Sequence, residues 1–333
     1  MTIRIAILCN DRLCLPAVSW LIGSQLTVAV GMPAIDTVSN ETRMLVELQC
    51  KQNGVPFRTF SKQQLAEDMD RWLTEYRPDL VLVKTFPWLI PSTLLNRPAH
   101  GFVNFHYAPL PEYRGPAPLF WMIKDQAKEG GVTVHQMDNR FDTGPVFFQQ
   151  RLSISPDFTY GWLVTQLAYA GLQLCWALLQ GLATGTLQAV PQQEGKAGWF
   201  RRPQPADLVV NWEAMSASAI RSLALACNPW NKGAATSWNN WVFGLTDVSV
   251  DLNNDQAYSK LPGTVLHIDE QNGLIVSCLH DQLLRVNVVY CEEGFFPGHK
   301  LSLFGLKPGD RLGSYTMPAH SQTQPSSALH QST

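Results

Sequence analysis

The chain is poor in charge and has no large excess of either sign. Only 16% of its 333 residues are Asp, Glu, Lys or Arg, and the formal net charge is −2. Lys and Arg outnumber Asp and Glu by 18 to 16 before Pro203 and are outnumbered by 11 to 7 from there on. Nucleic-acid binders usually carry a basic patch, because neutralising phosphates supplies much of their affinity. Neither half shows this excess, which argues against a DNA or tRNA partner.

Sequence signals of several other protein classes are also missing. The seven cysteines are odd in number and include no CxxC pair, so neither a disulfide framework nor a zinc site is predicted. The first residues lack the basic region, apolar segment and cleavage site of a signal peptide. No apolar run approaches the roughly 20 residues that span a bilayer. We therefore expect a cytoplasmic protein with reduced, mostly buried thiols, no membrane partner and no metal.

What the first part of the chain does contain is an alternation of apolar strands with helices. Strands are predicted at 3–9, 26–32, 55–60, 79–86, 102–106 and 130–137, and helices at 16–24, 40–54, 61–78 and 160–185. This alternation is typical of a parallel sheet with helices on both faces. No GxGxxG follows the first strand, so a dinucleotide is not indicated. We expect an α/β domain with a Rossmann-like, mostly parallel sheet over residues 1–200.

The pattern changes after a polar segment with several glycines and prolines. A helix is predicted at 215–227, followed by strands at 234–238, 241–250, 263–268, 273–279 and 283–291. Short strands at regular spacing are typical of a small β-barrel. We expect an OB-like barrel domain over 201–313 and a disordered tail over 314–333, where apolar residues are almost absent.

Polar residues lie where predicted strands end. His106 ends the strand 102–106, and the loop containing Asp142 follows the strand 130–137. Open α/β sheets bind ligands beyond the carboxyl ends of their strands, so we expect these ends and the end of 79–86 to converge on one cleft. Asn104 lies two residues before His106, which places both side chains on one face of the strand.

These residue types suit acyl transfer. An amide and an imidazole side by side can hold one carbonyl oxygen as it gains negative charge. Asp142 can fix the imidazole, hold a water or accept a proton. No Ser or Cys nucleophile lies nearby, which favours direct transfer over a covalent acyl-enzyme. From spacing alone, a structural histidine and an ordinary Asp-Thr-Gly turn remain alternatives.

The segments NFHYAPLPEYRGPAP and GGVTVHQMDNRFDTGP together resemble the signature of the formyltransferases that use 10-formyltetrahydrofolate. The shared pattern is Asn-x-His, a Leu-Pro-x-Tyr-Arg-Gly loop, Gly-Val-Thr and a terminal Asp-x-Gly. The matching residues are Asn104, His106, Leu110, Pro111, Tyr113, Arg114, Gly115, Gly131, Val132, Thr133, Asp142 and Gly144. The resemblance covers about residues 1–200, and the segment 210–230 more weakly resembles the C-terminal domain of the tRNA and amino-sugar members.

The resemblance implies roles for particular residues. It makes Asn104, His106 and Asp142 catalytic, with an amine attacking the formyl carbon and no metal required. The residues that it places against the pterin are Phe86, Trp88, Leu89, Ile90, Asn139, Arg140 and Phe141. Those that it places near the acceptor substrate are Asn10, Tyr107 and Arg114, although Arg114 could instead brace its own loop. A homodimer is compatible with the resemblance.

Two departures from the family pattern bear on the acceptor. The loop after His106 reads YAPLP where Ser-Leu-Leu-Pro is common, and Ala108 and Pro109 remove a hydroxyl and stiffen the turn. The tRNA-specific members carry a basic loop early in the chain. In this chain Arg43 is the single Lys or Arg between residues 31 and 50. We therefore predict a small or carrier-tethered amine as acceptor: an amino-sugar nucleotide, an amino acid or an aminoacyl carrier. Methionyl-tRNA formyltransferase, a 10-formyltetrahydrofolate hydrolase and an inactive scaffold are the alternatives.

Overall fold

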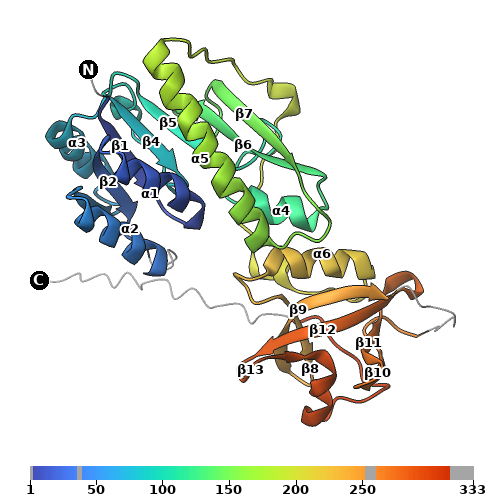
Figure 1. Cartoon of the computed structure of the whole chain (residues 1–333). Helices are drawn as coiled ribbons and strands as arrows, with labels where there is room; N and C mark the ends of the chain where they lie inside the picture. The colour runs from blue at the N-terminus through green and yellow to red at the C-terminus, as the bar shows by residue number, and fades with distance from the viewer. Residues whose placement is uncertain (1–2, 36–39, 252–259, 316–333) are drawn as a thin grey trace, which may run out of the picture.

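Two sheets, one in each half of the chain, organise the structure (Figure 1). The computed structural model describes residues 3–35, 40–251 and 260–315. The first sheet has the order β3-β2-β1-β4-β5-β6-β7. Its strands are β1 (Ile5–Cys9), β2 (Thr27–Pro33), β3 (Phe57–Phe60), β4 (Leu80–Lys84), β5 (Phe102–His106), β6 (Glu129–Gln136) and β7 (Val146–Ser153).

The direction of the strands corrects one expectation. All pairs from β3 to β5 are parallel, but β6 runs antiparallel to β5 and β7 antiparallel to β6. The sheet is thus mostly parallel, as predicted, but the end of β6 at Gln136 lies beside Val103, near the start of β5. The expected convergence of three carboxyl ends is therefore wrong for 130–137. The loop after β6 has to turn back along the sheet to reach the end of β5.

Helices cover both faces of this sheet. The helices α1 (Leu15–Gly23), α2 (Asn40–Gln52) and α5 (Tyr160–Thr184) contribute buried side chains to one core cluster. The helix α3 (Leu65–Tyr76) packs on the other face, where Met69 and Trp72 join a second cluster. Pro16 lies in the first turn of α1, where its missing N–H leaves no helical hydrogen bond unmade. The prediction of an α/β layered domain is confirmed.

The helix α5 corrects a second expectation. It has 25 residues without a charged side chain, and by length and apolar composition it could cross a membrane. The statement that no segment of this kind exists was thus wrong. In the structure Leu163, Leu167 and Leu178 of this helix are fully buried against the sheet, as in the core helix of a folded domain. All seven cysteines are unpaired and buried, as predicted.

The second sheet is antiparallel and closes on itself. Its strands are β8 (Ala234–Trp238), β9 (Trp241–Asp251), β10 (Val265–Asp269), β11 (Gly273–Ser277), β12 (Leu283–Cys291) and β13 (Gly294–Pro297), preceded by α6 (Ala217–Cys227). The order is β10-β11-β12-β9-β8. Arg311 bridges to Thr264 at one edge and Gly313 to Ser237 at the other. Because both edges are thereby covered, the prediction of a small barrel is confirmed.

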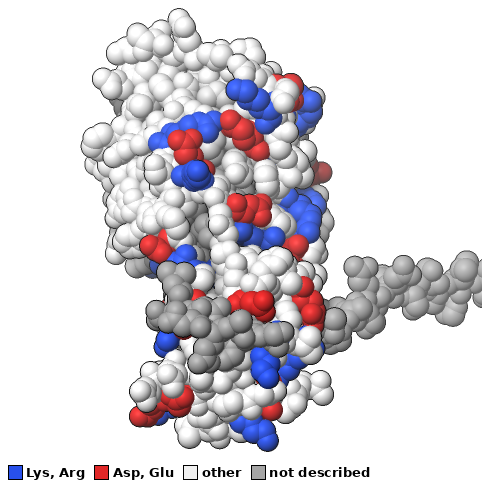
Figure 2. Space-filling model, turned by 90° about the vertical axis from the view of Figure 1, so that its right-hand side faces the viewer, with Lys and Arg blue, Asp and Glu red and all other residues white. Residues whose placement is uncertain are grey.

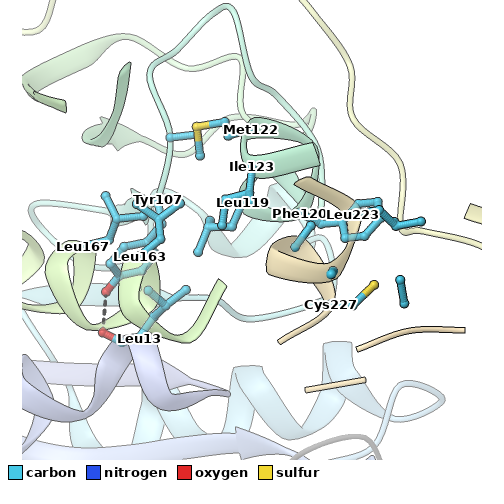
Figure 3. Close-up of a cluster of buried hydrophobic side chains, with 14 of the residues drawn as sticks. Leu13, Tyr107, Leu119, Phe120, Met122, Ile123, Leu163, Leu167, Leu223 and Cys227 are labelled. Atoms are coloured by element: carbon cyan, nitrogen blue, oxygen red, sulfur yellow. Dashed lines mark hydrogen bonds between the residues drawn. The ribbon is translucent and has the colours of Figure 1, made fainter. Parts of the chain in front are cut away.

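A layer of apolar side chains connects the region of the first sheet with the region of the second sheet. Phe120 of α4 (Pro118–Lys124) lies beside the α6 side chains of Leu223 and Cys227 (Figure 3). Its ring also meets that of Trp230 edge-on, with centroids 6.1 Å apart. The proposed boundary at residue 200 falls in the segment that runs along the first region, where Trp199 pairs with Arg114. The predicted tail lies outside the described residues from 316 onward.

Candidate active site

The side chains of Asn104 and His106 project from one face of β5 and meet Asp142. The amide Nδ2 of Asn104 lies 3.5 Å from Asp142 Oδ1, and Nδ1 of His106 lies 3.5 Å from the same oxygen. His106 and Asp142 retain only 8% and 11% of their side-chain exposure. The structure thus brings together all three residues that the resemblance makes catalytic, at the carboxyl end of a central strand.

Asp142 is held in place from its main chain and from its second carboxylate oxygen. Its φ of 56° lies in the left-handed region, which non-glycine residues adopt mainly where the surroundings enforce it. The N–H of Gly115 donates to Asp142 Oδ2 at 3.0 Å, and Gln192 Nε2 donates to the Asp142 carbonyl at 3.0 Å. A side chain on Gly144 would come within 1.8 Å of the Gln136 carbonyl oxygen. The turn that returns Asp142 to β5 therefore requires glycine at position 144.

The hydrogen bonds of His106 define which ring nitrogen faces the site. Its Nε2 lies 2.6 Å from the carbonyl oxygen of Tyr113. A carbonyl only accepts, so Nε2 carries a proton and donates it to this oxygen. The nitrogen that faces Asp142 and the open side is then Nδ1, which donates when the ring is protonated.

The proline-rich loop after His106 supplies that carbonyl. Thr133 in β6 donates its hydroxyl to the Ala108 carbonyl and accepts from the N–H of Leu110. Further along, the ring of Tyr113 stacks on Phe200 with centroids 4.7 Å apart. The loop is therefore braced on both sides, which fixes the Tyr113 carbonyl that orients the imidazole.

A further histidine, His135 in β6, lies behind Asn104 and was not singled out from the sequence. Its Nδ1 is 2.9 Å from the Gln136 carbonyl and must donate there, so in the neutral ring Nε2 accepts from Asn104 Nδ2 at 3.1 Å. Burial lowers the pKa of His135, which favours this neutral form. The period of β6 was the available signal, because Thr133 and His135 alternate with Val132 and Val134 and share one face.

Tyr107 does not lie at the site. Its side chain is buried beside Leu163 and Leu167 of α5, and its hydroxyl donates to the Leu13 carbonyl at 2.9 Å (Figure 3). Burial raises the pKa of its phenol well above the usual value. The expected contact with the acceptor is therefore wrong, because neighbouring residues of an extended chain point to opposite faces of the sheet.

Arg114 is engaged within the protein. Its guanidinium donates to both carboxylate oxygens of Glu194, each at 2.9 Å, and to Gln192 Oε1 at 2.8 Å. Since Gln192 also holds the Asp142 carbonyl, Arg114 acts on the site through Gln192. The alternative that Arg114 braces its loop agrees with this geometry, and the expected acceptor contact does not. Glu194 comes from the polar segment between the two predicted domains, to which the sequence analysis assigned no role, and Gln192 lies just before that segment.

Asn10 lies at the end of β1, two strands from β5 on the same edge of the sheet. Within the described residues, its Oδ1 is buried and has no hydrogen-bond partner. The next residue, Asp11, accepts from the Leu13 N–H, yet burial raises the pKa of its carboxyl group to about 6. The end of β1 thus carries a buried side-chain oxygen without a hydrogen-bond partner, as expected of a position next to a ligand.

The segment after β4 and the loop after β6 border the site from another side. Trp88 and Met137 pack on the same apolar cluster as Phe86 and Ile90, whereas Leu89 is 40% exposed. Among the described residues, no hydrogen bond engages the main chain of positions 88–90. In the facing loop Asn139, Arg140 and Phe141 are exposed. Free main-chain groups next to exposed loop residues suit a flat ligand with donors and acceptors along its edge.

Pockets elsewhere in the structure do not mark this site. Two pockets, of about 330 Å³ and about 390 Å³, lie at the amino end of β4 and β5, and Pro98 and Ala99 line both. Neither is lined by Asn104, His106 or Asp142. The candidate site is thus defined by hydrogen-bond geometry at the opposite end of the sheet.

Comparison with known proteins agrees with this description. Residues 17–177 match the formyl transferase family, and residues 203–294 match the formyl transferase C-terminal domain. The methionyl-tRNA formyltransferase of Geobacter metallireducens is 29% identical over 275 residues, which cover 80% of this chain and 84% of that protein. The methionyl-tRNA formyltransferase of Carboxydothermus hydrogenoformans is 30% identical over 232 residues, covering 70% and 73%.

Two solved structures share the fold at low identity. The N-formyltransferase from Helicobacter canadensis in complex with folinic acid and dTDP-3-aminofucose has a TM-score of 0.61 at 15% identity, covering 85% of this chain and 98% of that one. HypX from Aquifex aeolicus in complex with tetrahydrofolic acid has a TM-score of 0.59 at 15% identity, covering 96% and 51%.

Together, the fold and the comparisons place the protein in the class of enzymes that transfer a one-carbon group. More particularly, the chain belongs to the formyl transferase family, and both family regions are present. The predicted family and the prediction that the chain is an enzyme are thus confirmed.

Proposed function

We propose that the protein is an N-formyltransferase that moves a formyl group from 10-formyltetrahydrofolate to the primary amine of a small or carrier-tethered acceptor. One observation carries the proposal: Asn104 Nδ2 and His106 Nδ1 both lie 3.5 Å from Asp142 Oδ1. Two nitrogen donors and a carboxylate at one point can stabilise an oxyanion and move a proton. No covalent nucleophile is required for transfer to an amine.

The contacts assign a role to each side chain. The acceptor nitrogen attacks the formyl carbon, and the electrons of the C=O bond move to its oxygen. Asn104 Nδ2–H and, with the imidazole ring protonated on both nitrogens, His106 Nδ1–H hold this oxyanion. Asp142 Oδ1 accepts the proton that the amine nitrogen loses, directly or through one water. As the C=O bond reforms, the bond from carbon to folate nitrogen breaks, and that nitrogen takes up the proton that Asp142 had accepted, which returns Asp142 to its carboxylate form.

The residues present fit the folate co-substrate. The unengaged main chain at 88–90 can read the edge of a pterin, and the exposed ring of Phe141 lies in the facing loop. The solved relatives named above contain folinic acid or tetrahydrofolic acid. Phe86 and Ile90 are buried and Trp88 is half-buried against them, so these three would shape the segment while Leu89 lies at its surface.

Surface charge favours a small acceptor over a tRNA. Arg43 is bound to main-chain carbonyls, with its Nη2 2.8 Å from the Ile35 oxygen. On the face shown in Figure 2, basic and acidic side chains alternate and form no continuous basic area. A tRNA-binding face requires such an area because phosphate contacts supply much of the affinity. The second candidate, methionyl-tRNA formyltransferase, is favoured by the names of the relatives with 29–30% identity.

A formyl-transfer assay tests the proposal. The purified protein is mixed with 10-formyltetrahydrofolate, and release of tetrahydrofolate is followed by absorbance. The acceptor arms are no acceptor, a panel of amino-sugar nucleotides and amino acids, an aminoacyl carrier protein, and initiator methionyl-tRNA. Release that requires a small or tethered amine supports the proposal, release only with tRNA supports the second candidate, and release without acceptor indicates a hydrolase.

Matched variants connect activity to the site. His106→Ala is expected to lower kcat by about 10²-fold or more, because it removes one oxyanion donor. His100→Ala is the control, since His100 is exposed at the opposite end of the same strand. Equal activity of His106→Ala and wild type would contradict the mechanism and favour an inactive or differently organised site.

A further inference from the structure

Three aromatic side chains stand out on the solvent face of α5. Trp162, Tyr169 and Trp176 are 53%, 59% and 55% exposed, although aromatic rings of this size are usually buried for the most part. They follow one another at intervals of seven residues. Seven residues are close to two helical turns, so the three rings lie along one line of the helix.

The face that carries these rings has no charge. The other exposed positions between 162 and 180 are Thr165, Gln166, Gln173 and Gln180, and no Asp, Glu, Lys or Arg occurs between Tyr160 and Thr184. Exposed faces of helices normally carry charged side chains, which keep them in water. An uncharged stripe with three half-exposed aromatic rings instead resembles the contact surface of a helix pair.

The apolar surface continues onto the neighbouring helices. Trp20 of α1 packs against Trp176 with ring centroids 5.6 Å apart. On α2, which lies on the other side of α1 (Figure 1), Met44, Leu45 and Leu48 are 68%, 48% and 51% exposed. We call these residues on α5, α1 and α2 the α5 face. Three rings exposed by about half supply roughly 300 Å² of apolar area, since each ring has about 150–250 Å² to bury. With the side chains of α2, the α5 face reaches the size at which an exposed apolar patch commonly marks an interaction surface.

The chemistry of this face selects the occupant. A nucleic acid or an anionic lipid surface would be met by Lys and Arg, which α5 lacks. A two-fold contact places the same surface against itself, so a central charge would repel its own copy. The stripe on α5 has no charge that would repel a second copy, and its seven-residue spacing suits packing against an antiparallel helix at a shallow angle.

We infer that the α5 face is a self-association surface, where a second copy of this chain packs its α5 antiparallel against this one. The stripe is centred on Tyr169, so the two-fold axis passes close to this residue. The candidate active site opens at the carboxyl end of β5, and none of its three residues belongs to α5. The inference is therefore independent of which amine the protein formylates.

Sedimentation equilibrium of the full chain between about 1 and 100 µM tests the inference. Wild type is expected to show a dimer, and Tyr169→Lys is expected to weaken dimerisation at least 100-fold, because it places two positive charges at the axis. Gln63→Lys adds the same charge at an exposed position ahead of α3, on the other face of the sheet, and should dimerise like wild type. A monomeric wild type, or a dimer that persists in Tyr169→Lys, overturns the inference.

A crosslinking variant keeps the test decisive if Tyr169→Lys fails to fold. All native cysteines are buried, so Gln173→Cys provides an accessible thiol one turn from the axis. A short bis-maleimide should convert most of this variant to covalent dimer, whereas Gln63→Cys should stay monomeric under denaturing conditions. Equal crosslinking of the two variants would contradict the placement of the contact on α5.

Discussion

The neutral histidine behind Asn104 makes a sharp prediction for catalysis. An Asn side chain can present either its N–H₂ or its oxygen to the site, and only the N–H₂ can stabilise an oxyanion. His135 Nε2 accepts from Asn104 Nδ2 at 3.1 Å and thereby selects the productive orientation. We expect His135→Leu, which removes the acceptor at similar volume, to lower kcat while leaving KM for the acceptor nearly unchanged.

The size of the effect follows from the hydrogen bonds involved. A hydrogen bond of about 1.4 kcal/mol corresponds to a factor of about ten in the population of one orientation. The complete loss of an oxyanion donor costs about 10²–10³ in kcat, which sets the upper limit. Asp142, 3.5 Å from the same nitrogen, still favours the productive orientation. We therefore expect a decrease in kcat of about tenfold to 100-fold.

The comparison with His135→Gln isolates the hydrogen bond. Its side-chain oxygen can replace the acceptor, so this variant should recover at least half of the loss. Steady-state kinetics with thermal unfolding of each variant separates a positioning effect from a folding effect. If folded His135→Leu keeps wild-type kcat, or if His135→Gln is equally impaired, the proposed role of His135 is wrong.

Three further predictions concern residues around the site. Tyr107→Phe should lose only the hydrogen bond to Leu13, destabilising the fold by about 1 kcal/mol in urea unfolding with KM unchanged; a raised KM would return Tyr107 to the substrate site. Gly144→Ala should abolish activity and lower the melting temperature, since its Cβ would lie 1.8 Å from the Gln136 oxygen; an active, stable variant would contradict the turn described above. Lys84→Met should raise the free energy of unfolding near pH 7 by about 1–3 kcal/mol, because burial lowers the pKa of Lys84 from 10.5 to about 8. The penalty of the buried charge is complete below pH 8 and disappears as the pH rises to 10.5, so the gain should vanish at high pH; a gain independent of pH would contradict this account.

Much of the fold could be predicted because it is encoded locally. Buried strands such as 79–86 are visible as apolar runs in the sequence. The short strands of the barrel are visible as regularly spaced segments separated by turn residues. The direction of β6 and the existence of β7 could not be read this way. Val146–Ser153 mixes apolar and polar residues, and whether a strand runs parallel or antiparallel depends on the path of the chain between strands. The expectation of three converging carboxyl ends failed for this reason.

The site residues divide in the same way. The spacing of Asn104 and His106 fixed their common face, because the period of a strand is a local property. The position of Gln192 could not be foreseen, since it reaches Asp142 from 50 residues further along the chain. The resemblance placed Arg114 near the acceptor, with bracing of its own loop as the alternative. In the fold its ligand is Glu194, a residue whose proximity no sequence period reveals.

Several residues of the motif that carries the family resemblance hold the side chains of His106 and Asp142 in place. Thr133 holds the main chain of the proline-rich loop, and this loop returns the Tyr113 carbonyl to His106. Gly115 donates its N–H to Asp142, and a side chain there would lie 2.5 Å from the Phe200 carbonyl oxygen. The dense run of prolines after His106 is therefore explained by orientation, since an oxyanion donor is effective only when its direction is fixed before the reaction begins. Substitutions in this loop should accordingly lower kcat before they raise KM, whereas substitutions that affect the acceptor should be found outside the motif.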